Sequence, residues 1–364
     1  MRMCNKNVFK IWHIILSVNI KCSVYVLILM LLTCPLGRVR GGSPENKGND
    51  SGYITVLAAG NNINLMWDAV TVDINGNPEE GAIHYRVYCD TLAHFTHTLS
   101  NWVATVSDIT QFEHSSSWIG LPERNLYYTV TAVDEYGNES RPSSQVGEFD
   151  FALLPGESGT EFRYNALTAV LDNPVIVDAQ SLAESIGGVY AAYCWDKENQ
   201  TWKYWLPDFA LGENFELLTG RPYFLSLTDQ AISISTQTGN LPIPGSVVFD
   251  LIPGEEEFSF SYNLISLPLE MNDIGTADEL AQHIGGVYSI YTWDNVEQTW
   301  SFWIPEFALG ENFKVRPGYP YLLSLTHNAP TVWPNPSLAK QSAAGELNHF
   351  TRSAAAVRLH PPRP

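Results

Sequence analysis

The chain contains two copies of one module, and this duplication constrains its fold more than any other feature. A shift of 98 residues superimposes residues 162–228 on residues 260–326 without a gap, and 35 of the 67 paired positions are identical. Internal repeats predict that one structural unit is built twice. Tandem copies usually serve display, spacing or multivalent binding, whereas an enzyme with a single site does not need them. The duplication therefore predicts an architecture but does not name a ligand.

Each copy is predicted to be mostly β with one short helix. Thr276 and Glu279 form a capping box, which marks a helix start, and Asp178 takes the cap position in the first copy. A pair of glycines ends the helix in both copies. A hairpin follows, with residues 189–195 and 202–206 as its strands, and Val189, Ala191, Tyr193 and Trp195 are expected to share one face. The pattern YNLISLPL, VYxxYxWD, QTW and GxPYxLSLT resembles tandem modules of large bacterial surface proteins.

The segment 52–148 shows period-two alternation interrupted by turn signals, which predicts a β-sandwich. Three elements carry a more specific pattern: Leu65-Met66-Trp67, the strand at 85–88, and the run at 127–134 that ends in Gly137-Asn138-Glu139-Ser140. On these residues the segment resembles a fibronectin type III domain. The resemblance implies a role in adhesion or spacing and implies no chemistry.

These patterns divide the chain into five parts and define its fold class. The prediction is mostly β: a fibronectin type III-like β-sandwich plus two tandem β-rich modules, each with one short helix. The expected parts are a signal or leader segment at 1–42, the sandwich at 52–148, repeat 1 at 149–246, repeat 2 at 247–337 and a disordered tail at 338–364.

Residues 1–42 carry six basic and no acidic residues, and an apolar run spans residues 24–32. A basic stretch before a short apolar run is typical of a secretory signal. Cleavage, an uncleaved anchor and a lipoprotein at Cys34 are three routes that the sequence leaves open. We expect a secreted or cell-surface protein of bacterial origin, with membrane contact only through this segment if it is uncleaved or lipidated.

The remainder of the chain is strongly acidic. Residues 43–364 hold 14 Lys and Arg against 39 Asp and Glu, a net charge of −25. Such a surface repels phosphates, so we predict that the chain does not bind nucleic acid. Outside the first 42 residues the only cysteines are Cys89 and Cys194, which suffice for neither a disulfide framework nor a zinc site.

Trp205 and Trp303 are the candidate ligand-binding residues. Alternation turns them away from the face of Trp202 and Trp300. An accessible indole offers a sugar ring a flat apolar platform, and the carboxylates of Asp208 and Glu306 could accept hydrogen bonds from its hydroxyls. The competing interpretation is that the helix or the other copy covers this second face, since Trp packs more often than it binds.

No metal or cofactor is predicted. The loop Asp73–Glu80 has spaced oxygen ligands that suit Ca²⁺, but Pro78 and His84 replace two residues that a calcium loop of the EF-hand type requires. An ordinary turn is the favoured interpretation. His94, His97 and His114 lack a carboxylate at matching spacing and indicate a surface loop rather than a metal site.

No catalytic residue is predicted, and the chain is expected not to be an enzyme. Asp196 and Glu213 recur as Asp294 and Glu311, yet their positions in a turn and a loop suit structural roles. The prediction is a non-enzymatic exported or cell-surface scaffold, adhesion or interaction protein, whose partner is a protein or polysaccharide at the cell surface. The alternatives are a carbohydrate-binding accessory protein that uses the two Trp residues, and a hydrolase with an unrecognised site.

Overall fold

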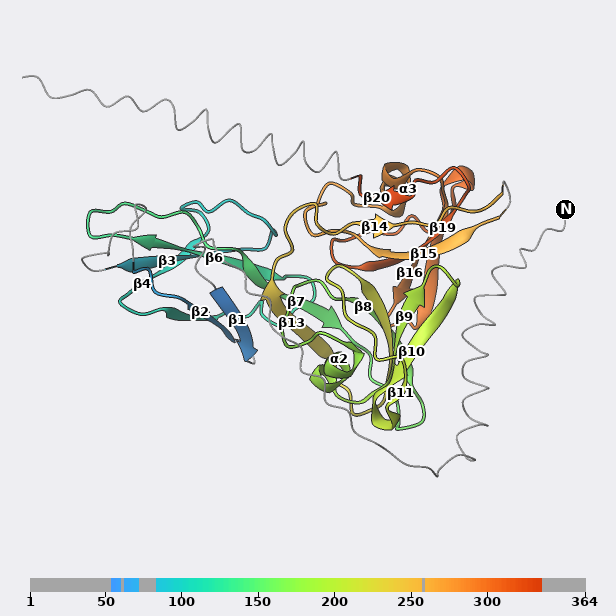
Figure 1. The fold of residues 1–364 in the computed structure, drawn as a ribbon, viewed down its shortest axis with the longest axis horizontal. Helices are drawn as coiled ribbons and strands as arrows, with labels where there is room; N and C mark the ends of the chain where they lie inside the picture. The colour runs from blue at the N-terminus through green and yellow to red at the C-terminus, as the bar shows by residue number, and fades with distance from the viewer. Residues whose placement is uncertain (1–53, 60–61, 72–82, 257–258, 336–364) are drawn as a thin grey trace, which may run out of the picture. The chain divides into compact units, whose positions relative to one another are not determined.

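The computed structural model describes residues 54–59, 62–71, 83–256 and 259–335, all within one compact unit (Figure 1). The predicted leader at 1–42, the loop Asp73–Glu80 and the tail at 338–364 lie outside the described residues. Across those described ranges, no helix has the length and apolarity needed to cross a membrane. In the described residues strands dominate and both α-helices, α2 and α3, are short, so the predicted mostly-β fold class is confirmed.

The first domain is a sandwich of two antiparallel sheets. Apolar side chains that alternate along the strands, such as Ile63, Leu65 and Trp67, are buried between the sheets, as the period-two pattern predicted. The Trp67 ring packs against Tyr85 with 5.4 Å between the ring centroids. One sheet holds β1 (Ile54–Ala59), β2 (Asn62–Trp67) and β5 (Gln111–Ser115); the other holds β3 (His84–Asp90), β4 (Trp102–Ser107), β6 (Leu126–Val133) and β7 (Val146–Ala152).

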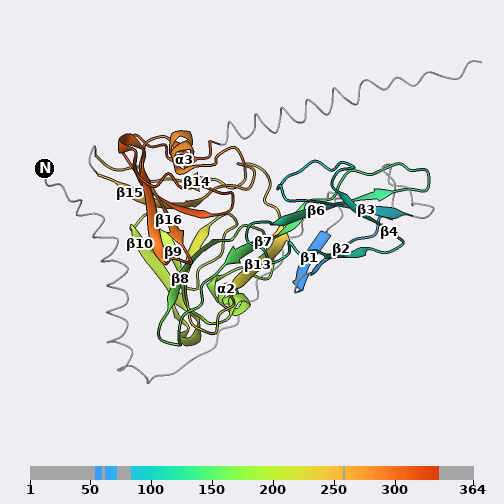
Figure 2. The same cartoon turned by 180° about the vertical axis from the view of Figure 1, so that it is seen from behind.

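The last strand of the sandwich is shared with repeat 1. β13 (Ile234–Asn240), from the end of repeat 1, pairs antiparallel with β7 along its whole length and extends the order to β13-β7-β6-β3-β4. Figure 2 shows β7 and β13 side by side. Phe149 and Phe151 on β7 belong to the core of repeat 1. The sequence boundary between residues 148 and 149 thus falls inside a single strand.

Each repeat is a five-stranded antiparallel sheet with one helix against it. Repeat 1 has the order β11-β10-β9-β12-β8, and repeat 2 has the same order as β18-β17-β16-β19-β15. The strands of repeat 1 are β8 (Arg163–Thr168), β9 (Val189–Asp196), β10 (Thr201–Leu206), β11 (Leu211–Gly212) and β12 (Pro222–Leu227). Those of repeat 2 are β15 (Ser261–Ser266), β16 (Val287–Asp294), β17 (Thr299–Ile304), β18 (Leu309–Gly310) and β19 (Pro320–Leu325). The short pair β14 (Phe249–Asp250) and β20 (Val332–Trp333) corresponds, by the shift of 98 residues, to the pairing of β7 with β13.

Both helices begin and end where the sequence predicted. In α2 (Ala179–Ile186) the Asp178 carboxylate accepts a hydrogen bond from the Ser181 amide at 2.8 Å, and in α3 (Ala277–Ile284) the Thr276 hydroxyl accepts from the Glu279 amide at 3.3 Å. Gly187 and Gly285 follow the helices with φ of 70° and 78°, a region that favours glycine. The capping signals are therefore confirmed.

The predicted common face of the hairpin strand is wrong at its first residue. The register between β9 and β12 shifts at Ser226 and Leu227, so Val189 faces the helix-side core together with Ala192. An extra residue in one strand moves the side chains before it to the other face of the sheet. Sequence alternation alone did not reveal this bulge.

The two repeats pack on each other through the faces of their sheets that point away from the helices. The Trp195 indole donates to the Tyr262 carbonyl at 2.9 Å, and the Trp293 indole donates to the Tyr164 carbonyl at 2.9 Å. The Phe224 ring lies 5.6 Å from Trp300 and 6.4 Å from Trp293. β12 and β19 are consequently buried on both faces, with the helix-side core on one and the other repeat on the opposite one.

Two glutamines clamp the edge strands of this interface. Gln298 accepts from the Tyr164 amide at 2.8 Å and donates to the Tyr164 carbonyl at 2.6 Å. Gln200 makes the same pair of bonds with Tyr262, at 2.7 and 3.0 Å. The Trp and Gln hydrogen bonds map onto their counterparts by the shift of 98 residues, so through them the repeats form the self-complementary contact of a two-fold pair inside one chain.

Replacing either clamp with alanine tests this pairing. Gln200→Ala and Gln298→Ala each leave a backbone amide and carbonyl of an edge strand without their partner. We therefore expect each change to lower the free energy of unfolding by about 1–3 kcal/mol, measured by urea denaturation. Gln230→Ala is the matched control, because Gln230 is exposed. Equal effects of Gln200→Ala and Gln230→Ala would contradict the role of the clamp.

Candidate functional site

The predicted binding residues Trp205 and Trp303 lie on the helix side of their sheets. Both indoles are half-buried and pack against the cores under α2 and α3. The Trp205 indole donates to the Gln180 side-chain oxygen at 2.9 Å, and the Trp303 indole donates to the Asp278 carboxylate at 3.1 Å. The helix thus covers part of each ring and occupies its polar edge.

Asp208 and Glu306 are exposed in two short 3₁₀ turns, η1 (Pro207–Phe209) and η2 (Pro305–Phe307). The aromatic residue that follows each carboxylate is also exposed, at 57% for Phe209 and 60% for Phe307. A flat apolar ring beside a carboxylate is therefore present in both copies. This exposed ring belongs to the Phe that follows the predicted carboxylate. It is a different residue from the half-buried Trp that the sequence singled out.

Each repeat exposes a small group of apolar side chains around its hairpin, which we call the apolar edge. Ala210 and Ala308 adopt left-handed backbone conformations, with φ of 46° and 44°, directly after the exposed Phe residues. Leu211 and Leu309, in the edge strands β11 and β18, are 52% and 54% exposed. The apolar edge comprises Tyr204, Phe209 and Leu211 in repeat 1 and Phe302, Phe307 and Leu309 in repeat 2.

The rest of the repeated FALGENF segment has structural duties. The Asn214 side chain accepts from the Gln180 amide at 2.9 Å and so caps α2. At Gly212, an added Cβ would lie 2.2 Å from the Tyr204 carbonyl oxygen, so only glycine fits there. The exposed Phe and Leu side chains have no comparable packing role. Sequence reasoning missed them because the local pattern does not reveal whether an apolar side chain in a turn or loop is exposed.

The repeated carboxylates Asp196 and Glu213 take part in structural contacts. Asp196 accepts hydrogen bonds from Asn199 and from the backbone amide of Glu198 within the hairpin turn. The bonds from Asn199 hold the pKa of Asp196 below its usual range. Glu213 forms an ion pair with Lys203 at 3.1 Å. These contacts keep Asp196 ionised and do not prepare it to act as a general acid.

The carboxyl group with a strongly raised pKa lies elsewhere, on the strand shared by the sandwich and repeat 1. Glu148 and Asp150 are both completely buried on β7. Burial, together with the neighbouring Asp150, raises the pKa of Glu148 to about 9. The Leu126 amide donates to Glu148 at 3.0 Å, and Thr236 donates to Asp150. A raised pKa can mark an active site, but complete burial keeps a substrate away from this pair.

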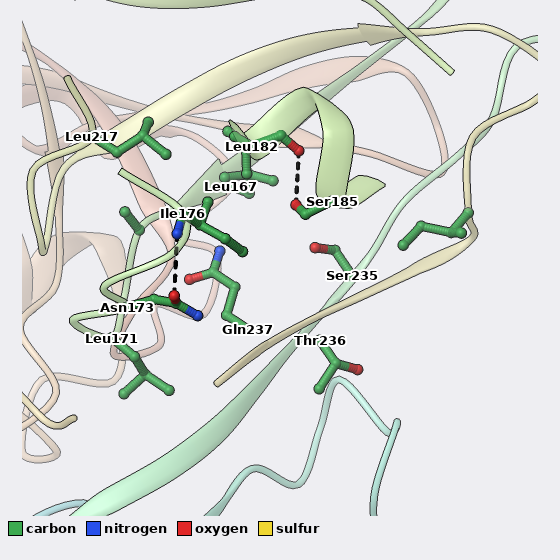
Figure 3. Close-up of a pocket in the computed structure, with 12 residues that line it drawn as sticks. Leu167, Leu171, Asn173, Ile176, Leu182, Ser185, Leu217, Ser235, Thr236 and Gln237 are labelled. Atoms are coloured by element: carbon green, nitrogen blue, oxygen red, sulfur yellow. Dashed lines mark hydrogen bonds between the residues drawn. The ribbon is translucent and has the colours of Figure 1, made fainter. Parts of the chain in front are cut away.

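A cavity of about 60 Å³ lies under α2 (Figure 3). Leu167, Leu182 and Ile176 supply an apolar lining, and Gln237 and Ser235 add polar groups from β13. Gln237 already bonds the Val170 amide at 3.0 Å and the Thr168 carbonyl at 2.7 Å. This volume suits water molecules and is well below that of a small-molecule site, which starts at roughly 300 Å³.

Two of the three histidines considered as metal ligands, His97 and His114, have aromatic partners instead. His114 lies 2.9 Å from the Tyr128 hydroxyl, and the His97 ring packs edge-on to Tyr88 at 5.2 Å. In the described part of the chain, no group of three or more His, Cys, Asp or Glu side chains is arranged to hold a metal ion. The candidate calcium loop Asp73–Glu80 is outside that part.

The buried carboxyl pair makes stability depend on pH. Glu148 keeps its proton up to about pH 9 in the folded chain, whereas an unfolded Glu loses it near its ordinary pKa of about 4.3. The folded state therefore binds more protons across this window, and stability falls as the pH rises through it, by at most about 1.4 kcal/mol per pH unit.

Glu148→Gln should flatten this slope and stabilise the chain at neutral and alkaline pH. Urea unfolding between pH 5 and 9 measures both effects. The exposed Glu198 provides the control, because Glu198→Gln should leave the slope unchanged. An unaltered slope in Glu148→Gln would show that another group causes it.

Comparison with known proteins adds little to this geometry. No protein-family model matches the chain, and no curated protein matches it. Among solved structures, the crystal structure of the FN1–FN3 domains of chicken CNTN1 is similar at 10% sequence identity. It covers 76% of this chain and 94% of its own, with a TM-score of 0.16. The fold and site described above therefore stand on the geometry of this chain alone.

Proposed function

We propose that this chain is a non-enzymatic interaction protein, a scaffold or adhesion element that is exported to the cell surface. The observation that carries the proposal is the apolar edge, which each repeat exposes at equivalent positions. Folding does not require these Phe and Leu side chains to be apolar, since they are more than half exposed. Exposed apolar side chains that recur together favour a binding role.

The pairing of the repeats adds a second argument for binding. Hydrogen bonds and aromatic contacts join the two copies, so their apolar edges belong to one body rather than to two freely linked domains. Two equivalent edges on one body can engage a repetitive partner at the same time, and the second contact then benefits from a high effective concentration. Surface proteins and polysaccharides are repetitive partners of this kind.

Carbohydrate binding is the second candidate function. It is favoured by Phe209 beside Asp208 and by Phe307 beside Glu306, where an exposed ring adjoins a carboxylate. The half-buried Trp205 and Trp303 would contribute to the same sites in this proposal. Export rests on the basic and apolar leader in the sequence.

Phe209→Ser and Phe307→Ser test the interaction role. The purified chain is applied to immobilised polysaccharides and cell-surface proteins, and binding is followed by biolayer interferometry. Each single change should weaken binding by about tenfold or more through loss of avidity, and the double change should abolish it. Leu99→Ser is the control, because Leu99 is 79% exposed in the sandwich, outside both apolar edges. Unaltered binding by the double variant would overturn the proposal.

Trp205→Ala combined with Trp303→Ala separates the two candidate functions. Loss of binding to polysaccharides alone supports the carbohydrate-binding function. Retained polysaccharide binding would show that the two indoles are not part of the binding site. Circular dichroism of each variant checks that the half-buried replacements leave the fold intact.

A further inference from the structure

Equivalent positions at the contact between the two repeats do not always hold chemically similar residues, although the shift of 98 residues relates them. On one side Tyr319 packs against Phe149 and Phe151, with ring centroids 6.1 and 5.5 Å apart, and its hydroxyl donates to the Pro122 carbonyl at 3.2 Å. The residue at the matching position on the other side is Arg221. Lys197 likewise matches Asn295. Two polar or aromatic residues on one side are thus replaced by two cations on the other.

A cavity of about 330 Å³ lies beside these two cations. Its apolar lining comes from both repeats and includes Trp195, Tyr223 and Phe249. The volume falls at the lower end of the range of small-molecule sites, which is roughly 300–1,000 Å³. Such sites combine apolar walls with a few polar groups that orient the ligand. This cavity has both features.

Arg221 supplies the orienting group. Its guanidinium lies over the Phe249 ring at 4.4 Å and donates to the Val248 carbonyl at 2.8 Å. Within the described residues no carboxylate approaches it within 4.0 Å, the limit for an ion pair. Guanidinium has five N–H donors, so one bond to a carbonyl leaves capacity for an anion. Burial lowers the pKa of Arg221, and the Asp250 carboxylate, which also lines the cavity, opposes this shift.

Lys197 adds a second positive charge at the same cavity. Its ammonium donates to the Asp250 carbonyl at 2.8 Å and lies 3.8 Å from the Asp250 carboxylate. That carboxylate is 77% exposed, and Glu216, which also lines the cavity, is exposed as well. Hydration and salt screen exposed charges much more than buried ones. The half-buried guanidinium therefore dominates the interior of the cavity.

We propose that this cavity binds a small organic carboxylate with an apolar, preferably aromatic, body. Arg221 matches the geometry of a carboxylate with two parallel N–H groups, and Lys197 adds a point charge. Trp195, Tyr223 and Phe249 surround the apolar part. The site is independent of the apolar edges, so it goes beyond the interaction function proposed above.

Calorimetric titration of the full chain tests the proposal with benzoate, phenylacetate and hydrocinnamate as probes. Each acid is compared with its neutral amide, which has nearly the same shape without the charge. We expect saturable binding of at least one acid and binding of its amide that is weaker by about tenfold or more. Equal binding of acid and amide, or no saturable binding of any of the three acids, would overturn the proposal.

Two variants locate the binding. Arg221→Tyr introduces the residue that the other side of the pair holds, and Arg221→Gln keeps a polar side chain but removes the charge. Both should weaken acid binding by about tenfold or more. Arg163→Gln is the control, since Arg163 forms an ion pair with Glu157 outside the cavity. The double variant Phe209→Ser/Phe307→Ser should bind the acid normally. Acid binding that survives Arg221→Tyr in a folded chain would place the ligand elsewhere.

Discussion

The reciprocal contact between the two repeats is the interaction on which the rest of the structure depends. A five-stranded sheet with Trp and Tyr side chains on both faces would expose a large apolar surface if one face lay in water, and the helix covers only one face. The second copy covers the other. The indoles of Trp195 and Trp293 show this directly, because each donates to a backbone carbonyl of the opposite repeat. Duplication therefore covers an apolar face of the sheet that a single copy would leave exposed.

The same contact explains which residues differ between the copies. Residues in each hydrophobic core and at each clamp recur, because every repeat both gives and receives the same bonds. Positions outside these shared bonds are free to diverge once two copies share one chain. Tyr319 and Arg221 are such a pair: one fills its side of the interface, and the other borders a cavity. A two-fold pair of identical chains could not produce this difference.

The sandwich joins this pair through the backbone. β7 serves the sandwich at its start and the core of repeat 1 at its end, and β13 completes the pairing. Complete burial of the Glu148 carboxyl group beside Asp150 on β7 makes the stability of this joint depend on pH. Asp196 in the hairpin turn behaves differently, because hydrogen bonds from Asn199 and the turn amides stabilise its charged form and lower its pKa. Location in the fold, and not residue type, decides what each acid does.

The sequence by itself determined the elements. Period-two alternation indicated strands such as β2, β3, β6 and the hairpin of each repeat, the capping residues Asp178 and Thr276 marked the helix starts, and the shift of 98 residues defined two copies of one unit. These signals depend on residues that are close in the chain, so they can be recognised without the tertiary structure. Tertiary structure decided the rest. It showed that Trp202 and Trp300 face the other repeat, that the helix covers part of Trp205, and that a bulge turns Val189 into the core. It also exposed Phe209 and placed Arg221 beside a cavity, since exposure and cavities depend on residues distant in the chain.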